Sequence, residues 1–295
     1  MSLQVFILTH NRPDSLLKTL QSVLRQTYTD YELIVSDNSD NDLTREALHR
    51  AFPEGFPFQY HQRVPCLSSN AHFNQVLTEV TADYFMLFHD DDLMHDDLLE
   101  TAMSKFANSE DIVAVASNAI YVNQKKHTRE KQPLEQDLLL SSSTAIVKQY
   151  LINRCLPFPS YIYKKVIAEQ LRFDLSKGNK YCDAAFIVDL TRFGSILYSA
   201  KPTMDYFIYA SQDSASHDYV GNVKLLNYFL KHSNYTRNSR PVLAFRLRNL
   251  YCELFWNRNT SLRFRHFLGL VLSYGEWKFA VRSILRYFYY KIAHR

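Results

Sequence analysis

Three consecutive carboxylates, Asp90, Asp91 and Asp92, are the residues of this sequence best suited to chemistry. They follow a short apolar and aromatic run, residues 84–88, whose length is typical of a buried strand. Adjacent carboxylates repel one another, so a cation or several hydrogen-bond donors must meet them. Hard oxygen ligands suit Mg²⁺ or Mn²⁺, which also bind substrate phosphates. The run therefore predicts a metal and phosphate site at the carboxyl end of a strand, where open α/β sheets bind ligands.

A second acidic loop follows an earlier strand-like run, residues 31–36, and begins at Asp37. The carboxyl ends of parallel strands meet at one edge of a doubly wound sheet, so we expect Asp37 and Asp91 to line one crevice. The alternative for the three carboxylates is that they only charge the N-terminus of a helix expected over residues 95–106.

The elements that must position these side chains alternate between strand-like and helix-like patterns. The expected strands are residues 4–9, 31–36, 58–64, 84–88 and 112–117. Helical spacing covers residues 16–24, 42–52, 68–80 and 95–106. This alternation predicts βαβ units and an α/β fold with a mainly parallel sheet flanked by helices.

The pattern changes after residue 118. A turn-like charged stretch over 124–130 is followed by two helical patterns, a strand-like run over 156–163, a helix over 164–171 and a loop over 173–180. A further helix is expected to begin at residues 182–183 and to end at 193–194, where Gly194 is a helix terminator. Residues 196–198 and 204–209 are expected to form a final pair of strands.

Composition excludes several classes of site. With 6 glycines, the chain contains neither the GxGxxG nor the GxxxxGK[ST] phosphate loop. No two of its four cysteines have CxxC spacing, which argues against a zinc or redox motif and favours reduced thiols in a cytosolic protein. We expect no secretory signal and no membrane-spanning segment.

The C-terminal part is strongly basic. From Arg237 onward there are 12 Lys and Arg against 2 Asp and Glu, whereas the preceding residues hold 22 against 28. Basic residues there alternate with apolar and aromatic ones at helical spacing, which is typical of a helix lying on an anionic membrane surface. The alternatives are a helical part that packs on protein and, less favoured, a nucleic-acid-binding segment that lacks a recognised module.

Several segments together resemble family 2 glycosyltransferases. They are VFILTHNR (5–12), YELIVSDNS (31–39), Asn74, DYF (83–85), FHDDD (88–92), FD (173–174), CD (182–183) and RFG (192–194). The resemblance covers about the first 215 residues, and it implies a GT-A fold, a nucleotide-sugar donor and a divalent metal. In this sequence His89 stands where many members have Asp, and Cys182 replaces the usual Glu.

The resemblance also implies roles for individual residues. The donor nucleotide would be bound by Thr9, Asn11, Arg12, Asp37, Asn74 and Asp90. Mn²⁺ or Mg²⁺ would be held by Asp91, with Asp92 assisting, and Asp183 would be the general base. The alternative for Asp183 is an ordinary helix N-cap.

These expectations define three parts and one leading function. Residues 1–120 would form the nucleotide-sugar-binding half, 121–215 the acceptor-binding half, and 216–295 a basic helical extension rich in aromatic residues. The expected protein is a metal-dependent inverting glycosyltransferase that uses a UDP- or dTDP-sugar. Its acceptor would be a glycan or lipid-linked glycan of cell-surface polysaccharide synthesis, at the cytoplasmic face of a membrane. The rival functions are a sugar nucleotidyltransferase and an inactive scaffold that docks partners through its tail.

Overall fold

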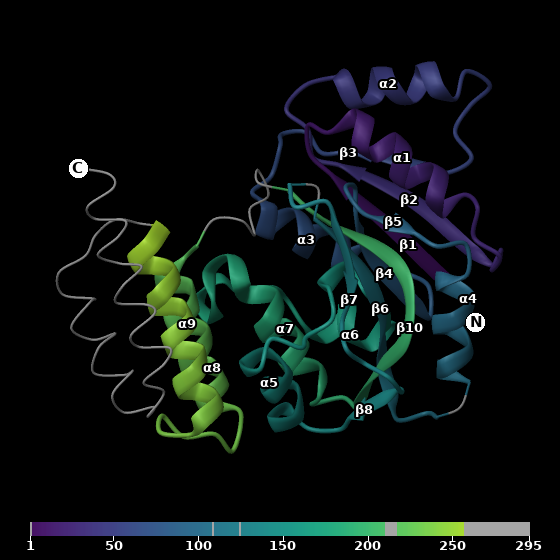
Figure 1. Ribbon diagram of the computed structural model, residues 1–295. Coiled ribbons are helices and arrows are strands. Elements are labelled where there is room, and N and C mark those ends of the chain that lie inside the picture. Colours follow the sequence, from purple (N-terminus) through teal and green to yellow (C-terminus); the bar gives the residue numbers. More distant parts are fainter. Residues whose placement is uncertain (1, 108, 124, 210–216, 257–295) are drawn as a thin grey trace, which may run out of the picture. The chain divides into compact units, whose positions relative to one another are not determined.

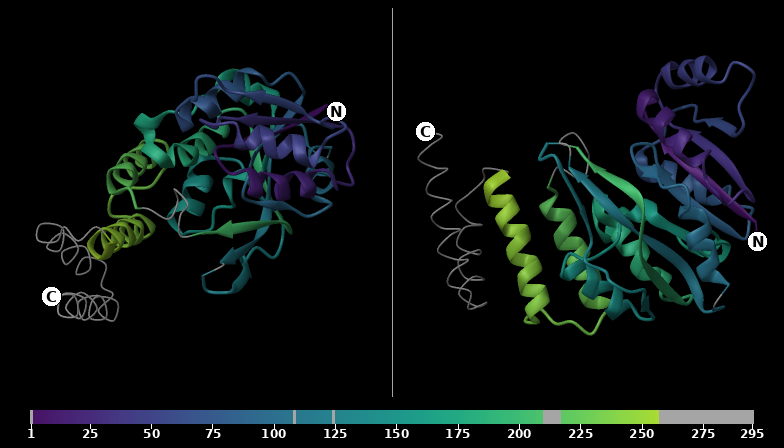
Figure 2. Two further views of the ribbon diagram at one scale, coloured as in Figure 1. Left: turned by 90° about the horizontal axis from the view of Figure 1, so that it is seen from above. Right: turned by 45° about the vertical axis from the view of Figure 1, so that its right-hand side comes forward.

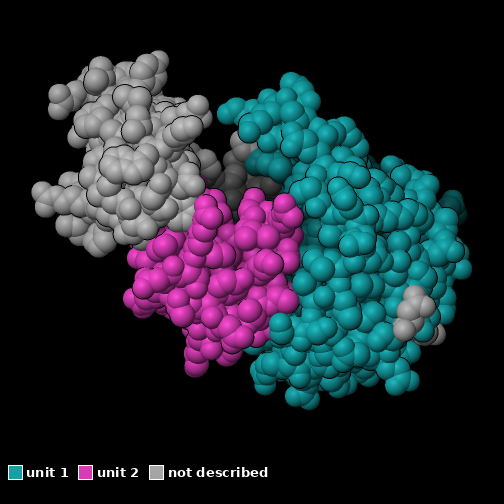
Figure 3. All heavy atoms as spheres, turned by 60° about the horizontal axis from the view of Figure 1, so that its bottom comes forward, with its two compact units in different colours: residues 1–142, 155–174, 186–212 teal, residues 143–154, 175–185, 213–295 magenta. Residues whose placement is uncertain are grey.

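The computed structural model describes residues 2–107, 109–123, 125–209 and 217–256. The chain divides into two compact units, which have different colours in Figure 3. The first unit contains residues 1–142, 155–174 and 186–212, and the second contains residues 143–154, 175–185 and 213–295. The boundaries expected at residues 120 and 215 stay predictions.

The first 106 residues form the alternating strands and helices that the sequence predicts (Figure 1). In chain order these are β1 (Leu3–Thr9), α1 (Pro13–Val23), β2 (Tyr31–Asp37), α2 (Leu43–Ala51), β3 (Gln59–Gln62), α3 (Ser69–Thr78), β4 (Tyr84–His89), β5 (Leu93–Met94) and α4 (Leu98–Phe106). The two-residue strand β5 is the one element of this part that the sequence did not predict.

The later elements of the first unit are mostly strands. They are β6 (Ile112–Asn123), β7 (Thr128–Lys131), β8 (Leu138–Leu140), β9 (Tyr161–Lys164), α6 (Lys165–Gln170) and β10 (Ser195–Ile208). Helix α7 (Cys182–Leu190) begins in the second unit and ends in the first.

Among the described residues, ten strands form one sheet. Its main path has the order β3-β2-β1-β4-β9-β6-β10-β5, with β7 on β6 and β8 on β10. Strands β1 to β4 pair in parallel, and so do β6 and β10. Strand β9 lies between β4 and β6 and is antiparallel to both. The sheet is therefore mixed, with one reversed strand between two parallel groups.

Helices cover both faces of the parallel group. Alternate residues of β1, β2 and β4 join one buried cluster with α1, α2 and α4, and the members from these three strands are Leu3, Val5, Ile7, Leu33, Val35, Met86 and Phe88. Helix α3 packs on the opposite face, where His72 contacts Ser36 of β2. Each fully buried aliphatic or aromatic side chain contributes about 1.5–3 kcal/mol to folding, so this double layer fixes the strand ends that carry the acidic loops.

The second half differs from the prediction in three places. Strand β6 continues to Asn123 and forms a hairpin with β7, where a charged turn was expected. One helix, α5 (Ser143–Leu151), follows instead of two helical patterns, and β8 takes the place of the other. The expected pair of late strands is the single strand β10, which lies beside β6 along its length in Figures 1 and 2. Shifts of register around Pro202 absorb the residue that lacks an N–H donor.

Helix α7 ends at Leu190, earlier than the expected end at residues 193–194, and Gly194 closes the turn that follows it. Its φ is +158°, and a Cβ there would lie 2.3 Å from the carbonyl oxygen of Asp111. Another side chain at this position would push the start of β10 away from β6.

The second unit is helical in its described part. It contains α5, two short 3₁₀ turns (Leu175–Lys177 and Asn179–Tyr181), α8 (Tyr219–Lys231) and α9 (Arg240–Trp256). Asp218 caps α8 by accepting a hydrogen bond from N of Gly221 at 2.8 Å. The helical prediction for the tail is thus confirmed to residue 256, and residues 257–295 lie outside the described part. Among the described helices, none is long and apolar enough to cross a membrane.

Candidate active site

The carboxyl ends of β1, β2 and β4 bring the predicted acidic residues together. Thr9 ends β1 and is the register partner of Asp37 on β2, and Leu8 is the partner of His89 on β4. The hydroxyl of Thr9 donates to Oδ2 of Asp90 at 2.7 Å, and both side chains are buried. Asp37 and Asp90 therefore flank Thr9 at one edge of the sheet, and the shared crevice of Asp37 and Asp91 stays a prediction.

Arg12 contacts two members of the acidic run from the turn before α1. Its Nη1 lies 2.6 Å from Oδ2 of Asp91, and its Nη2 lies 3.3 Å from Oδ1 of Asp90. Burial raises the pKa of Asp90 to about 6, although Arg12 and the Thr9 hydroxyl favour its ionised form. The guanidinium thus offsets part of the repulsion between neighbouring carboxylates.

Asp92 forms a hydrogen bond to strand β10, in the second parallel group of the sheet. Its Oδ1 accepts a hydrogen bond from the backbone N of Phe207 on β10 at 2.9 Å. Its Oδ2 is buried and has no hydrogen-bond partner among the described residues. Burial raises the pKa of Asp92 well above its usual range, and the charge of Asp91 raises it further. A buried carboxylate oxygen without a partner is costly, which is the condition that a bound cation relieves.

The ligand atoms that could hold such a cation form a compact group. One donor atom from each of His89, Asp91 and Asp92 lies within 4.8 Å of the others. Burial lowers the pKa of His89, which favours the neutral ring that can bind a metal. Burial and the charges of the nearby Asp91 and Asp92 raise the pKa of Tyr209, so its phenol stays protonated.

Asp37 is buried and hydrogen-bonded at both oxygens. Its Oδ1 accepts from N of Ser39 at 2.9 Å, and its Oδ2 accepts from the hydroxyl of Tyr60 at 2.6 Å. Each carboxylate oxygen has the capacity to accept a second hydrogen bond. Tyr60 was not predicted as a site residue, because its contact depends on the parallel register of β2 and β3 rather than on a motif.

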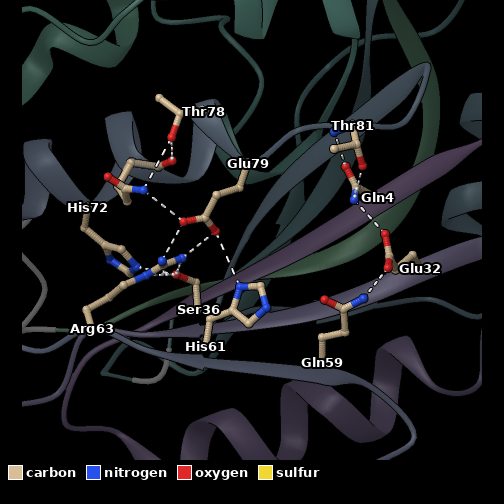
Figure 4. A network of polar contacts seen from close by, with 11 residues as sticks. Gln4, Glu32, Ser36, Gln59, His61, Arg63, His72, Thr78, Glu79 and Thr81 are labelled. Atoms are coloured by element: carbon tan, nitrogen blue, oxygen red, sulfur yellow. Dashed lines mark hydrogen bonds and ion pairs between the residues drawn. The ribbon is translucent and has the colours of Figure 1, made fainter.

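A polar network lies behind Asp37 on the α3 face of the sheet (Figure 4). We call it the Arg63 network, and it consists of Ser36, His61, Arg63, His72 and Glu79. Arg63 donates from Nε and Nη2 to the Ser36 hydroxyl, at 3.0 and 2.7 Å, and forms two hydrogen bonds to Glu79, at 2.6 and 2.8 Å. Its backbone N donates to the carbonyl oxygen of Asp37 at 2.8 Å.

His72 completes the Arg63 network. Its Nε2 lies 2.7 Å from Oγ of Ser36, and burial lowers its pKa to about 4. Because Arg63 already donates twice to that oxygen, the hydroxyl proton is left for Nε2 of a neutral ring. The network therefore ties the ends of β2 and β3 to α3 directly behind the predicted nucleobase contact.

The two predicted asparagines serve different contacts. Asn11 has a φ of +54°, and its Oδ1 accepts from Nδ2 of Asn41 at 2.9 Å and from N of Asp40 at 3.3 Å. This joins the loop after β1 to the loop after β2. Asn74 of α3 bonds both backbone groups of Phe173, accepting at 2.8 Å and donating at 3.0 Å.

Asp183 belongs to the second unit. It lies in the first turn of α7, one residue inside its start, and its Oδ1 accepts from N of Ala184 at 2.8 Å. Burial raises the pKa of Asp183 to about 6, which brings it near the range that suits a general base at neutral pH.

Solved structures share this arrangement of strands and helices. The structure of S. aureus TarS residues 1–349 with UDP-GlcNAc has a TM-score of 0.62 at 12% identity, and the match covers 94% of this chain and 81% of that 1–349 chain. A mannosyltransferase from Pyrobaculum calidifontis, in complex with GDP-Man and Mn²⁺, has a TM-score of 0.53 at 16% identity, with coverage of 97% and 85%. These likenesses confirm the GT-A fold of glycosyltransferases.

Sequence comparison identifies the family. The family model for glycosyl transferase family 2 matches residues 4–171. The chain belongs to glycosyl transferase family 2 and is thereby a glycosyltransferase. Protein CgeD of Bacillus subtilis (strain 168) is 25% identical over 130 residues, which are 41% of this chain and 30% of CgeD. The match thus spans less than a third of that relative.

Proposed function

We propose that the protein transfers a sugar from a UDP- or dTDP-linked donor to a hydroxyl group of a glycan or lipid-linked glycan. The observation that carries this proposal is the convergence of Asp37 and Asp90 on the two sides of Thr9. A carboxylate at Asp37 fits a base with a ring N–H, as uracil and thymine have. UDP-GlcNAc is bound by TarS and GDP-Man by the mannosyltransferase, so a nucleotide sugar is the donor class we infer for this fold.

The acidic run fits a divalent cation. Asp91 and Asp92 supply hard oxygen ligands, and the unpartnered Oδ2 of Asp92 would gain a charge partner. Mn²⁺ or Mg²⁺ bound there would stabilise the developing negative charge of the leaving diphosphate. Arg12 lies beside Asp91 and adds a second positive charge that can face phosphate oxygens.

Asp183 is the general base in this proposal. It takes the proton of the acceptor hydroxyl while that oxygen attacks the anomeric carbon and the carbon–oxygen bond to the diphosphate breaks. A carboxylate with a pKa of about 6 is ionised at neutral pH and is a better base than one with an ordinary pKa. One base without a separate nucleophile implies a single displacement and inversion of configuration.

The basic tail supports the proposed acceptor and location. Residues 237–295 carry the charge excess that suits an anionic membrane surface, and a lipid-linked acceptor would be held at that surface. We therefore propose peripheral association with the cytoplasmic face of a membrane and a role in cell-surface polysaccharide synthesis.

A thermal-shift panel tests the donor class. The full-length protein is heated with UDP-, dTDP- and GDP-sugars, each with and without Mn²⁺. A ligand at 100 times its Kd stabilises the fold by about 2.7 kcal/mol, which is readily detected. We expect stabilisation by a uracil or thymine nucleotide sugar that increases with Mn²⁺. A response to GDP-sugars alone would overturn the donor assignment, and no response to any of them would overturn the proposed activity.

A further inference from the structure

The imidazole of His89 stands at the cation site but has no role in the resemblance or in the proposed function. His89 is the last residue of β4, and the acidic run follows it directly. Among the described residues, neither of its ring nitrogens has a hydrogen-bond partner. Its nitrogens are not among the buried side-chain atoms that lack a partner, so they remain accessible to a ligand.

Two aromatic rings restrict the orientation of this imidazole. The ring of Phe73 on α3 lies 6.0 Å from it, and the ring of Phe158 lies 5.9 Å from it, both measured between centroids. A purely structural explanation is that His89 only packs between these two rings. Packing alone, however, does not account for a nitrogen that lies within 4.8 Å of carboxylate oxygens of both Asp91 and Asp92.

The spacing of the three donor atoms suits one ion. In an octahedral site with ligand distances of about 2.1 Å, ligand atoms are roughly 3.0 Å apart when adjacent and 4.2 Å apart when opposite. The three donor atoms already lie within 4.8 Å of one another and would move closer together around a bound ion. The buried Oδ2 of Asp92, which has no described partner, is a second and independent sign that this group is incomplete without a cation.

We propose that His89 is a direct nitrogen ligand of the divalent cation, together with Asp91 and Asp92. This inference rests on the proposed metal dependence and adds a ligand of a different chemical type. Imidazole favours later transition ions, whereas Mg²⁺ prefers oxygen. The site should therefore bind Mn²⁺ and Co²⁺ in preference to Mg²⁺ more strongly than a site made of oxygen ligands alone.

Pulsed electron paramagnetic resonance of bound Mn²⁺ tests the ligand directly. Full-length protein is labelled with ¹⁵N-histidine, and the nuclear modulation is compared with that of unlabelled protein, with and without UDP. We expect a directly coordinated histidine nitrogen in the wild type, which requires no variant to fold. The nitrogen signal should be absent from His89→Gln. It should be present in the control variant His95→Asn, because the wild-type His95 ring contacts Asp205 and not the cation site.

Affinity measurements complete the test. Titration should show that Mn²⁺ binds His89→Gln about tenfold or more weakly, since loss of a ligand costs at least as much as loss of its supporting contacts. His89→Asp should restore binding but reduce the preference for Mn²⁺ over Mg²⁺. Mn²⁺ bound to the wild type without histidine coupling would overturn this inference and leave the proposed function intact. Absence of Mn²⁺ binding, with or without UDP, would overturn both the inference and the proposed metal dependence.

Discussion

Nη1 of Arg12 lies 2.6 Å from Oδ2 of Asp91, so a side-chain cation already contacts a carboxylate that we assign to the metal. The arginine is half-exposed, and half-exposed ion pairs contribute about 0.5–1 kcal/mol. Its removal should therefore raise the affinity of the nucleotide-free protein for Mn²⁺.

The first prediction follows from this contact. Arg12→Ala should bind Mn²⁺ about 2- to 5-fold more tightly in calorimetric titration. This ratio corresponds to the loss of an ion pair worth about 0.5–1 kcal/mol. The variant should bind the nucleotide sugar more weakly, because a charge that faces phosphate is lost. Arg25→Ala removes an exposed ion pair to Asp96 and serves as the control. Unchanged or weaker Mn²⁺ binding by Arg12→Ala would contradict the prediction.

Asp91 and Asp92 should respond differently to substitution. Asp91→Ala should abolish transfer while changing the free energy of unfolding by only about 1 kcal/mol, because Asp91 forms its ion pair with the half-exposed guanidinium of Arg12. Asp92→Ala should lower the free energy of unfolding by about 1–3 kcal/mol, because the N–H of Phe207 loses its acceptor.

Asp92→Asn is the matched control for that stability effect. It keeps an acceptor for the N–H of Phe207 and removes a charge that burial disfavours, so it should be at least as stable as the wild type at pH 7. Denaturant unfolding measures all three variants. Full activity in Asp91→Ala would refute its assignment to the metal.

The Arg63 network should affect donor binding through Asp37. Arg63→Met removes the bonds to Ser36 and the ion pair to Glu79, which should cost about 2–3 kcal/mol of stability. Because these contacts hold the strand end that carries Asp37, KM for the donor should rise more than kcat falls. Arg63→Lys should recover part of this loss.

A second network in Figure 4 provides the control for this prediction. It ties the other end of the same strands through Gln4, Glu32, Gln59 and Thr81, with Gln4 Nε2 donating to Glu32 at 2.6 Å. Glu32→Ala should also destabilise the sheet but leave KM for the donor unchanged. An equal rise of KM in both variants would show that general loss of stability, and not the position of Asp37, is responsible.

The pKa of Asp183 predicts how transfer depends on pH. The base must be ionised, so kcat should fall as the pH drops through about 6 and level off above pH 7. Asp183→Asn should be inactive. Because the folded-state pKa is raised, ionisation destabilises the fold above pH 6, and the asparagine variant should be no less stable at pH 7.5. If Asp183→Asn instead retained activity and its kcat fell at low pH as in the wild type, Asp183 would not be the general base.

The basic tail can be tested without truncation. Truncation after Thr236 would remove α9, whose Val242, Leu247 and Leu250 are buried. Replacing Lys278, Arg282, Arg286 and Lys291 by Gln in the full chain should reduce sedimentation with phosphatidylglycerol vesicles by more than tenfold, at ~1 kcal/mol per charge. Vesicles of phosphatidylcholine are the control. Unchanged sedimentation with the anionic vesicles would support packing on protein instead.

The order of elements in the first 106 residues was predictable because apolar runs and turn residues alternate clearly there. The later part was harder. Thr128–Lys131 is polar and exposed, so β7 resembled a turn, and Pro202 made one irregular strand resemble two. The acidic loops could be predicted, since each follows a buried strand. The contacts of Tyr60 and Arg63 with the Asp37 end of β2 could not, because they depend on strand register and on the packing of α3.

The bond between Asp92 and β10 has a consequence for which substitutions this chain can accept. Its donor is a main-chain amide, so the bond itself does not depend on the side chain at position 207 and would survive most substitutions there. Only proline lacks the required hydrogen. A constraint of this kind leaves no signature in an alignment except the exclusion of a single residue type.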